Sequence, residues 1–272
     1  ENIGEVLNQG IDACVNWNDK VGEDFTYNLG LNITFTKNKL RKTNELSNIE
    51  DYRKSIGQPT SAIFGWQSQG LFGKDVAIAG HPFQSFGNYQ VGDIAYADLN
   101  NDGMVDNNDQ TRIGQSFPKT TLGVDVTLNY KGFGLYILGT ATTGVTQMLT
   151  STYYWNKGLD GYSVLAEDRY HPVNNPTGTQ PRLTTTSGVN NYRNSTFWTK
   201  NGSFFRLKNV ELSYTLNNNS KKGIGKNYKF FVRGANLFVL SGIKELDPEQ
   251  MLAGISNYPV YRTITGGVSI NF

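Results

Sequence analysis

The sequence lacks any apolar run that approaches the roughly 20 residues of a membrane-spanning helix. It has a single cysteine, Cys14, which excludes an internal disulfide. Charge is scarce and balanced, because charged residues make up only 18% of the chain and the formal net charge is +2. That balance gives no basis for nucleic-acid binding. Helical membrane spans and nucleic-acid partners are therefore excluded, whereas membrane-spanning strands, which hydropathy barely detects, are not.

The residues that most enzymes use for catalysis are also scarce. The two histidines, His81 and His171, each precede a proline in a polar segment. No nucleophile–base pair and no ligand spacing typical of a metal hydrolase is visible in the sequence. An enzyme is therefore the weakest interpretation.

The most informative pattern is the strict alternation of apolar and polar residues over positions 24–36. The apolar face has aromatic residues at both ends and aliphatic residues between them: Phe25, Tyr27, Leu29, Leu31, Ile33 and Phe35. Ten steps of about 3.3 Å, tilted by about 40°, rise roughly 25 Å, the height of the apolar band of a membrane barrel. The opposite face has no Lys, Arg or Glu, unlike a strand that faces solvent. The pattern favours a strand between lipid and a polar lumen.

Similar alternation predicts further strands along the chain. They fall at residues 5–17, 62–72, 121–130, 133–148, 195–216 and 228–240, with polar turns at 18–24, 131–132 and 217–227. In the segment 62–72, Trp66 is expected to belong to an aromatic girdle. Lys229 and Arg233 break the rule of small polar residues in the lumen, and the pattern offers no explanation for them. The fold class predicted is all-β, an antiparallel transmembrane β-barrel with long loops.

The chain ends on a strand, residues 261–272, with Ile264, Val268, Ile270 and Phe272 on its apolar face. The spacing polar–x–Gly–x–x–apolar–x–aromatic, carried by Thr265, Gly267, Ile270 and Phe272, resembles the assembly signal of outer-membrane β-barrels. An ordinary strand at the edge of a soluble domain is the alternative for this segment taken alone.

Residues 98–109 have the spacing of a calcium loop of the EF-hand type, with Gly103 at the sharp turn. The predicted ligands are side-chain oxygens or, for Met104, the carbonyl oxygen: Asp98, Asn100, Asp102, Met104, Asp106 and Asp109. The flanks are not helical, so a regulatory helix–loop–helix switch is not expected. A bound Ca²⁺ would instead be structural and would hold the loop in one conformation. An Asx-rich turn without metal remains the alternative.

Several motifs together resemble the C-terminal part of a SusC/RagA-type TonB-dependent outer-membrane transporter. They are residues 92–114 (GDIAYADLNNDGMVDNNDQTRIG), NNPTGTQPRL, STFWTKNGSFFRLKNVELSYTL, VRGANLF and the terminal GGVSINF. The resemblance covers nearly the whole chain, so residues 1–272 are expected to form one C-terminal part of the barrel.

The resemblance implies a 22-stranded barrel in the outer membrane of a Gram-negative bacterium, in contact with its lipid. It implies an N-terminal plug that engages the TonB complex, a SusD-like surface lipoprotein that closes the mouth, and uptake of oligosaccharides or peptides. The chain holds only about eight to ten of these strands and no plug. We therefore expect that it is a fragment of a longer polypeptide, or that the sequence represents only the C-terminal part of one.

Such barrels finish on the periplasmic side, which implies that residues 73–119 and 149–199 are extracellular. The same count makes residues 38–61 a long periplasmic loop, unless a further strand lies between Phe72 and Asp98. Residues 149–199 are the best candidate for contact with the lipoprotein. Tyr153, Tyr154 and Trp155 are candidate contacts for a sugar ligand, although girdle or loop packing is favoured for them.

A calcium-stapled secreted β-sandwich that binds glycan or protein is the serious alternative. It would explain the strands and the acidic loop, but neither the apolar face edged with aromatic residues nor the terminal Phe272.

Overall fold

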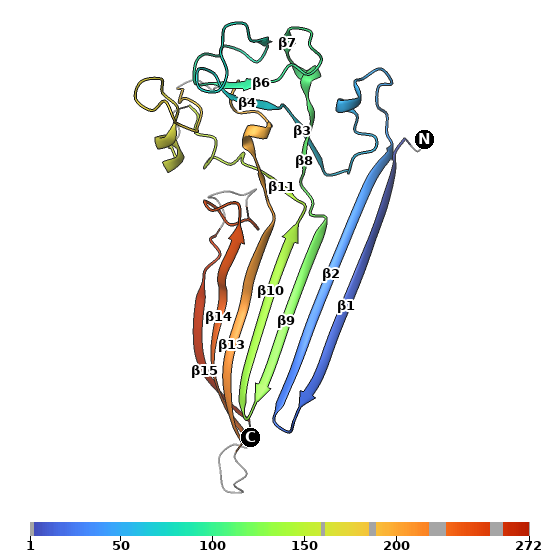
Figure 1. The fold of residues 1–272 in the computed structure, drawn as a ribbon, viewed down its shortest axis with the longest axis vertical. Helices are drawn as coiled ribbons and strands as arrows, with labels where there is room; N and C mark the ends of the chain where they lie inside the picture. Colours follow the sequence, from blue (N-terminus) through green and yellow to red (C-terminus); the bar gives the residue numbers. More distant parts are fainter. Residues whose placement is uncertain (1–2, 159–160, 185–188, 218–226, 251–257, 272) are drawn as a thin grey trace.

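The computed structural model of the chain describes residues 3–158, 161–184, 189–217, 227–250 and 258–271. Its main element is a seven-stranded sheet whose long strands run side by side along the molecule (Figure 1). The strands, in spatial order, are β1 (Glu5–Val21), β2 (Phe25–Lys42), β9 (Thr120–Tyr130), β10 (Phe133–Thr143), β13 (Phe204–Asn217), β14 (Asn227–Ser241) and β15 (Thr263–Asn271). Every neighbouring pair is antiparallel. The predicted all-β antiparallel class is confirmed.

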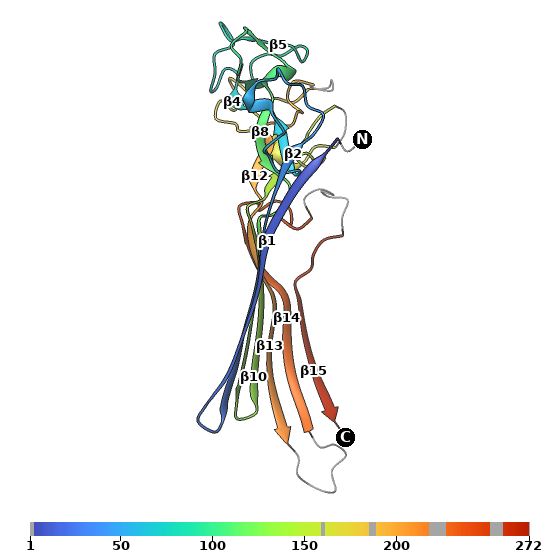
Figure 2. The ribbon, with the colours of Figure 1, turned by 90° about the vertical axis from the view of Figure 1, so that its right-hand side faces the viewer.

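The two ends of this sheet differ. At one end, here called the turn end, residues 22–24 join β1 to β2 and residues 131–132 join β9 to β10 (Figure 1). Lys131 and Gly132 both have positive φ, 46° and 86°, as a two-residue hairpin of the right twist requires. At the other end, here called the loop end, lie the long connections 43–119 and 144–203 and the segment after β14 (Figure 2).

The sheet corrects two expectations about the N-terminal half. β2 pairs directly with β9, so residues 43–119 form one excursion at the loop end. Residues 38–61 therefore do not form a loop at the turn end. The segment Ala62–Phe72 is not a wall strand either. It breaks at Trp66 and Gln67 into two short strands, β3 (Ala62–Gly65) and β4 (Ser68–Leu71). The main sheet consequently has fewer strands in the described residues than the eight to ten expected.

The connections at the loop end fold into a small body with a core of its own. We call this the loop body, formed by residues 43–119, 144–158, 161–184, 189–203 and 242–250. Its sheets are β3 with β8 (Thr111–Gln115), β4 with β6 (Ile94–Tyr96), β5 (Phe83–Gln84) with β7 (Met104–Val105), and β11 (Thr146–Met148) with β12 (Thr199–Asn201). The core gathers large side chains from all three segments: Trp66, Leu71, Phe86, Ile94, Tyr96, Val105, Leu149, Tyr154, Tyr170, Trp198 and Ile243. The three connections therefore share one hydrophobic core and do not fold as independent loops.

Trp66 belongs to this core and not to an aromatic girdle. Only 6% of it is exposed, and its indole N–H donates to the Asp106 carbonyl at 2.7 Å. Phe86 packs against it edge-on, with ring centroids 4.9 Å apart. The sequence segment around Trp66 alternates like a wall strand, but its side chains are buried by the loop body.

The apolar face of the main sheet lies open. Cross-strand pairing places Leu31 between Val15 and Val124, so the alternation predicted for each strand merges into one apolar band. The band continues to the far strands, where Leu212 is 57% exposed and its partner Val232 is 56% exposed. No second sheet covers this face in the described part of the chain. A water-soluble protein rarely exposes so large a continuous apolar surface.

No helix among the described residues is both long and apolar enough to cross a membrane.

Candidate functional site

The polar face of the sheet carries a charged cluster on β13 and β14. Glu211 is buried on β13, where its two carboxylate oxygens bind different cations of the next strand. Lys229 Nζ lies 2.6 Å from Oε1, and Arg233 Nε donates to Oε2 at 2.8 Å. Glu211 faces Arg233 directly in the strand register. The two cations that broke the predicted pattern therefore share one carboxylate, which leaves a net positive patch on this face.

An aromatic ring completes the patch. Phe231 lies between Lys229 and Arg233 on the same face of β14, and the Arg233 guanidinium lies 5.5 Å from its ring centroid. Phe231 is opposite Gly267 on β15. A Cβ at position 267 would lie only 2.5 Å from the Phe231 Cζ, so the glycine makes room for the ring. Cation, ring and cation thus form a compact surface that can contact anionic and apolar groups.

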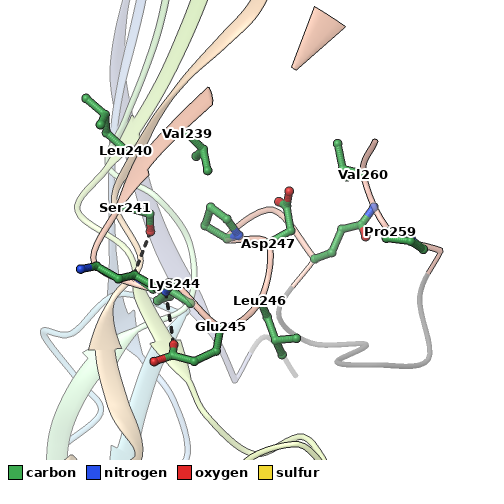
Figure 3. A pocket seen from close by; sticks show the side chains of 12 residues that line it. Val239, Leu240, Ser241, Lys244, Glu245, Leu246, Asp247, Pro259 and Val260 are labelled. Carbon is green, nitrogen blue, oxygen red and sulfur yellow. Dashed lines mark hydrogen bonds between the residues drawn. The ribbon is translucent and has the colours of Figure 1, made fainter. Parts of the chain in front are cut away.

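At the loop end, a segment after β14 folds over the same face. Arg206 of β13 is buried, and its Nη2 donates to both carboxylate oxygens of Asp247 at 2.7 Å. Lys208 Nζ lies 3.3 Å from Glu249. These ion pairs fix residues 242–250 beside a hollow of about 940 Å³ (Figure 3). Its lining combines apolar side chains with a few charges, including Val239, Ile243, Lys244, Glu245 and Leu246.

A buried polar network ties the two longest connections of the loop body together. Asp93 is 1% exposed; Arg182 Nη2 donates to its Oδ2 at 3.0 Å, and Arg182 Nε lies 2.8 Å from its Oδ1. Asn191 Nδ2 also donates to Asp93, at 2.8 Å, while its Oδ1 accepts from the backbone N–H of Ile94. These residues come from segments about 90 positions apart in the sequence. The network fixes how the two loops meet.

A second set of amides extends this network toward β6. Gln84 Nε2 donates to Asn190 Oδ1 at 2.6 Å, and its Oε1 accepts from the backbone N–H of Tyr96 at 2.7 Å. The Tyr96 hydroxyl donates to the Asn190 carbonyl at 2.8 Å. Burial raises the pKa of Tyr96, so this hydroxyl stays protonated and donates. Sequence reasoning missed these amides, since no local pattern marks a partner so distant in the chain.

The acidic loop 98–109 is held by bonds from its own backbone. Asp98 Oδ1 and Oδ2 accept from the N–H groups of Asn101 and Gly103, and Asp102 Oδ1 accepts from Met104 N. Gly103 has φ of 86° at the sharp turn, as predicted. The Asx-rich turn that was the alternative to a metal site is thus present.

The far end of that loop is held by a buried carboxylate. Asp109 Oδ1 accepts from Leu99 N at 2.7 Å and Oδ2 from Asp106 N at 2.8 Å, closing a capping box. Among the described residues, no group of three or more His, Cys, Asp or Glu side chains converges enough to hold a metal ion. Calcium binding by Asp98, Asn100, Asp102, Met104, Asp106 and Asp109 stays a prediction.

The aromatic run 153–155 packs within the loop body. Tyr154 is 3% exposed, and its hydroxyl donates to Glu245 Oε2 at 3.4 Å. The Trp155 ring lies 6.4 Å from that of Trp198, and Tyr153 packs edge-on against Tyr154. This is the loop packing that the sequence favoured. A ligand contact by Tyr153, Tyr154 or Trp155 remains a prediction.

The C-terminal motif occupies the outer strand of the sheet. β15 pairs with β14 and places Thr265 and Gly267 on the polar face and Ile270 on the apolar face, as the alternation predicts. Phe272 lies outside the described residues. The role of these residues as an assembly signal stays a prediction.

Comparisons with known proteins agree with this architecture. No protein-family model matches the chain. TonB-dependent receptor P26 of Formosa agariphila is 27% identical over 298 residues, which cover 100% of this chain and 30% of the relative. TonB-dependent receptor SusC of Bacteroides thetaiotaomicron is 26% identical and likewise covers the whole chain, which matches 27% of its length. The chain therefore spans less than a third of the curated relatives it matches.

Solved structures show the same fold. The RagAB peptide transporter superposes with a TM-score of 0.71 at 18% identity, covering 98% of this chain and 30% of that one. The RagAB peptide importer in its 'closed-closed' state gives a TM-score of 0.70 at 19% identity, with 98% and 30% covered. The resemblance predicted from the sequence motifs is confirmed.

Proposed function

This chain resembles TonB-dependent receptors of the SusC/RagA type along its whole length, and we propose that it forms part of the wall and outer loops of such a transporter. In this role the sheet stands in the outer membrane of a Gram-negative bacterium, with its apolar band in lipid and its polar face toward a lumen. The turn end is then periplasmic and the loop end extracellular. The chain acts by binding and gating, with no bond made or broken.

The observation that carries this proposal is the open apolar band. A band of exposed Leu, Val and Ile across the sheet is stable in hydrocarbon but would favour aggregation in water. The polar face is opposite in character, with Glu211, Lys229 and Arg233 in mutual contact. A β-sandwich would bury the apolar face against a second sheet. The exposed band disfavours the secreted sandwich.

Peptide or oligosaccharide cargo is consistent with the relatives, one of which is called a peptide transporter. The whole polypeptide would import such cargo with energy delivered from the TonB complex to a plug. Because the barrel wall cannot open sideways without unpaired backbone groups in lipid, movement is assigned to the plug, the loops or a lid. The hollow beside Asp247 and the patch around Phe231 lie on the cargo side in this arrangement.

The surface proposed to meet a SusD-like lipoprotein lid is the turn at residues 171–175 of the 149–199 connection. The backbone N–H of each of His171 and Asn175 donates to the carbonyl of the other, which makes a tight turn. Within this turn Val173 is 80% exposed. An exposed apolar residue held in a bonded turn is suited to a protein contact, since little conformational entropy is lost on binding.

Membrane fractionation of the full polypeptide tests the core of this proposal. We expect it to resist extraction with alkaline carbonate and to dissolve only in detergent. Recovery in the soluble fraction would favour the sandwich.

For the lid, Val173→Asp should weaken co-purification of the lipoprotein and uptake of cargo, while Val164→Asp, at another exposed valine of the same connection, serves as the matched control. Equal co-purification of Val173→Asp and the parent would refute the lid contact.

A further inference from the structure

The outward face of β2 changes character above the apolar band. Beyond Phe35, the next side chains of the same parity are Lys37, Lys39 and Arg41, all exposed. Strand pairing fixes this placement, because Phe35 is opposite Ile11, Lys37 is opposite Gln9 and Lys39 is opposite Leu7. Arg41 follows at a register shift, between the pairs Val6–Leu40 and Glu5–Lys42, and its guanidinium donates to Glu5. We call Lys37, Lys39 and Arg41 the basic ladder.

Most of the ladder's charge is unneutralised. Arg41 Nη1 lies 3.1 Å from Glu5 Oε1, and the side chains of both residues are about half exposed. Neither Lys37 nor Lys39 forms an ion pair within the described residues. The acidic groups of the adjoining loop are engaged elsewhere, since Glu45 accepts from Ser55, Glu50 binds Arg53 and Asp51 binds Lys54. Two free ammonium groups therefore stand directly above a hydrophobic surface.

Among the described residues, the opposite end of the band has no comparable feature. At the turn end, the same outward face ends in aromatic residues such as Tyr27, Tyr130 and Phe133. Lys131, in the turn beside these aromatic residues, pairs with Asp24 at 3.4 Å. In the described residues, the outward face of the band thus ends in aromatic residues at the turn end and in free cations at the loop end.

We propose that the basic ladder binds phosphate groups of an anionic glycolipid in the outer leaflet of the membrane. This inference rests on the proposed membrane placement of the sheet. With a strand tilt of about 40°, Lys37 stands roughly 5 Å higher than Phe35 along the membrane normal, and Arg41 roughly 15 Å higher. A phospholipid headgroup layer is only about 5–8 Å deep, so a ladder of that length fits a lipid with phosphates at more than one height. Cations beside a membrane attract anionic lipid, and ammonium groups on long stems reach phosphates while the stems stay in contact with apolar surface.

The test uses the full polypeptide in detergent and measures binding of rough-type lipopolysaccharide by native mass spectrometry. Lys37→Gln/Lys39→Gln is compared with Lys20→Gln/Lys244→Gln, which removes two exposed lysines outside the ladder. Each lost cation should weaken binding about fivefold, so the ladder variant should bind on the order of 25-fold more weakly. The control variant should bind like the parent.

Two further arms identify the ligand chemistry. The parent should bind dephosphorylated lipopolysaccharide no more tightly than the ladder variant binds the intact lipid. Millimolar inorganic phosphate should not displace the intact lipid, because a free anion lacks contact with the apolar band. The inference would be overturned if the ladder and control variants bound the intact lipid equally, or if the parent bound dephosphorylated and intact lipid equally. Displacement of the intact lipid by inorganic phosphate would also overturn it.

Heat-modifiable gel mobility separates this inference from the proposed function. All variants should show the mobility shift of a folded barrel, because the ladder lies beyond the apolar band. A folded barrel with unchanged lipid binding in the ladder variant refutes the ladder alone, whereas a parent without the shift, soluble in the absence of detergent, refutes the membrane placement itself.

Discussion

Asp93 and Arg182 form a buried ion pair that joins the two longest connections at the loop end of the sheet. The Asp93 side chain is 1% exposed, whereas that of Arg182 is 26% exposed, so the carboxylate depends on its protein partners. Asn191 supplies another bond to the same carboxylate. The loop body therefore has a polar link between segments distant in sequence, in addition to its apolar core.

Removing one partner of this pair should loosen the loop body and leave the barrel intact. Arg182→Ala leaves Asp93 buried with one cation fewer, a change that costs about 3–5 kcal/mol when a pair is fully buried and less here because Arg182 is partly exposed. Limited proteolysis should then cut within residues 149–199 at lower protease concentrations. Arg169→Ala is the control, since among the described residues the Arg169 guanidinium donates to the nearby Ala166 carbonyl and forms no ion pair. Identical digestion patterns for Arg182→Ala and the parent would argue against the link.

The assignment of faces predicts opposite outcomes for two neighbouring positions on β2. Leu31→Arg places a charge near the middle of the apolar band and should block assembly or cost about 2–4 kcal/mol. Asn32→Arg projects from the polar face and should be tolerated, because Asn32 is opposite Gly123, which leaves space. Heat-modifiable gel mobility of the two variants measures assembly. Equal tolerance of both charges would show that the faces are wrongly assigned.

Calcium binding at residues 98–109 is predicted from the spacing and can be separated from the Asx-rich turn. If Ca²⁺ binds, its addition should protect this loop from proteolysis, with oxygen ligands at about 2.3–2.6 Å in a crystal. Asp102→Ala should abolish the calcium-dependent protection. Asn107→Ala, which changes a residue of the same loop outside the predicted ligands, should retain it. Protection that is the same with Ca²⁺ and with a chelator would leave the turn stabilised by its backbone hydrogen bonds alone.

The parts predictable from sequence are those with local periodicity. Alternation located the strands and both faces correctly for β2, β9 and β15, because every second side chain of a strand lies on the same face. Trp66 was assigned wrongly because its short segment alternates like a wall strand, and only tertiary packing reveals the core it joins. Glu211 was not recognised as the partner of Lys229 and Arg233, since the pairing depends on the register between β13 and β14. The amides of Asn190 and Asn191 had no sequence signal at all.

The last strand combines the predicted assembly motif with a steric requirement. Gly267→Ala should impair barrel assembly by about 1–3 kcal/mol, because the new Cβ would meet the Phe231 ring and force it to move. Gly266→Ala provides the control, since a Cβ there has only the Phe231 carbonyl oxygen nearby, at 3.9 Å. The double variant Gly267→Ala/Phe231→Leu should recover assembly in urea-titrated refolding, because the smaller side chain leaves room for the methyl group. A defect that persists in the double variant would mean that the glycine is needed for another reason, such as recognition of the C-terminal motif during insertion.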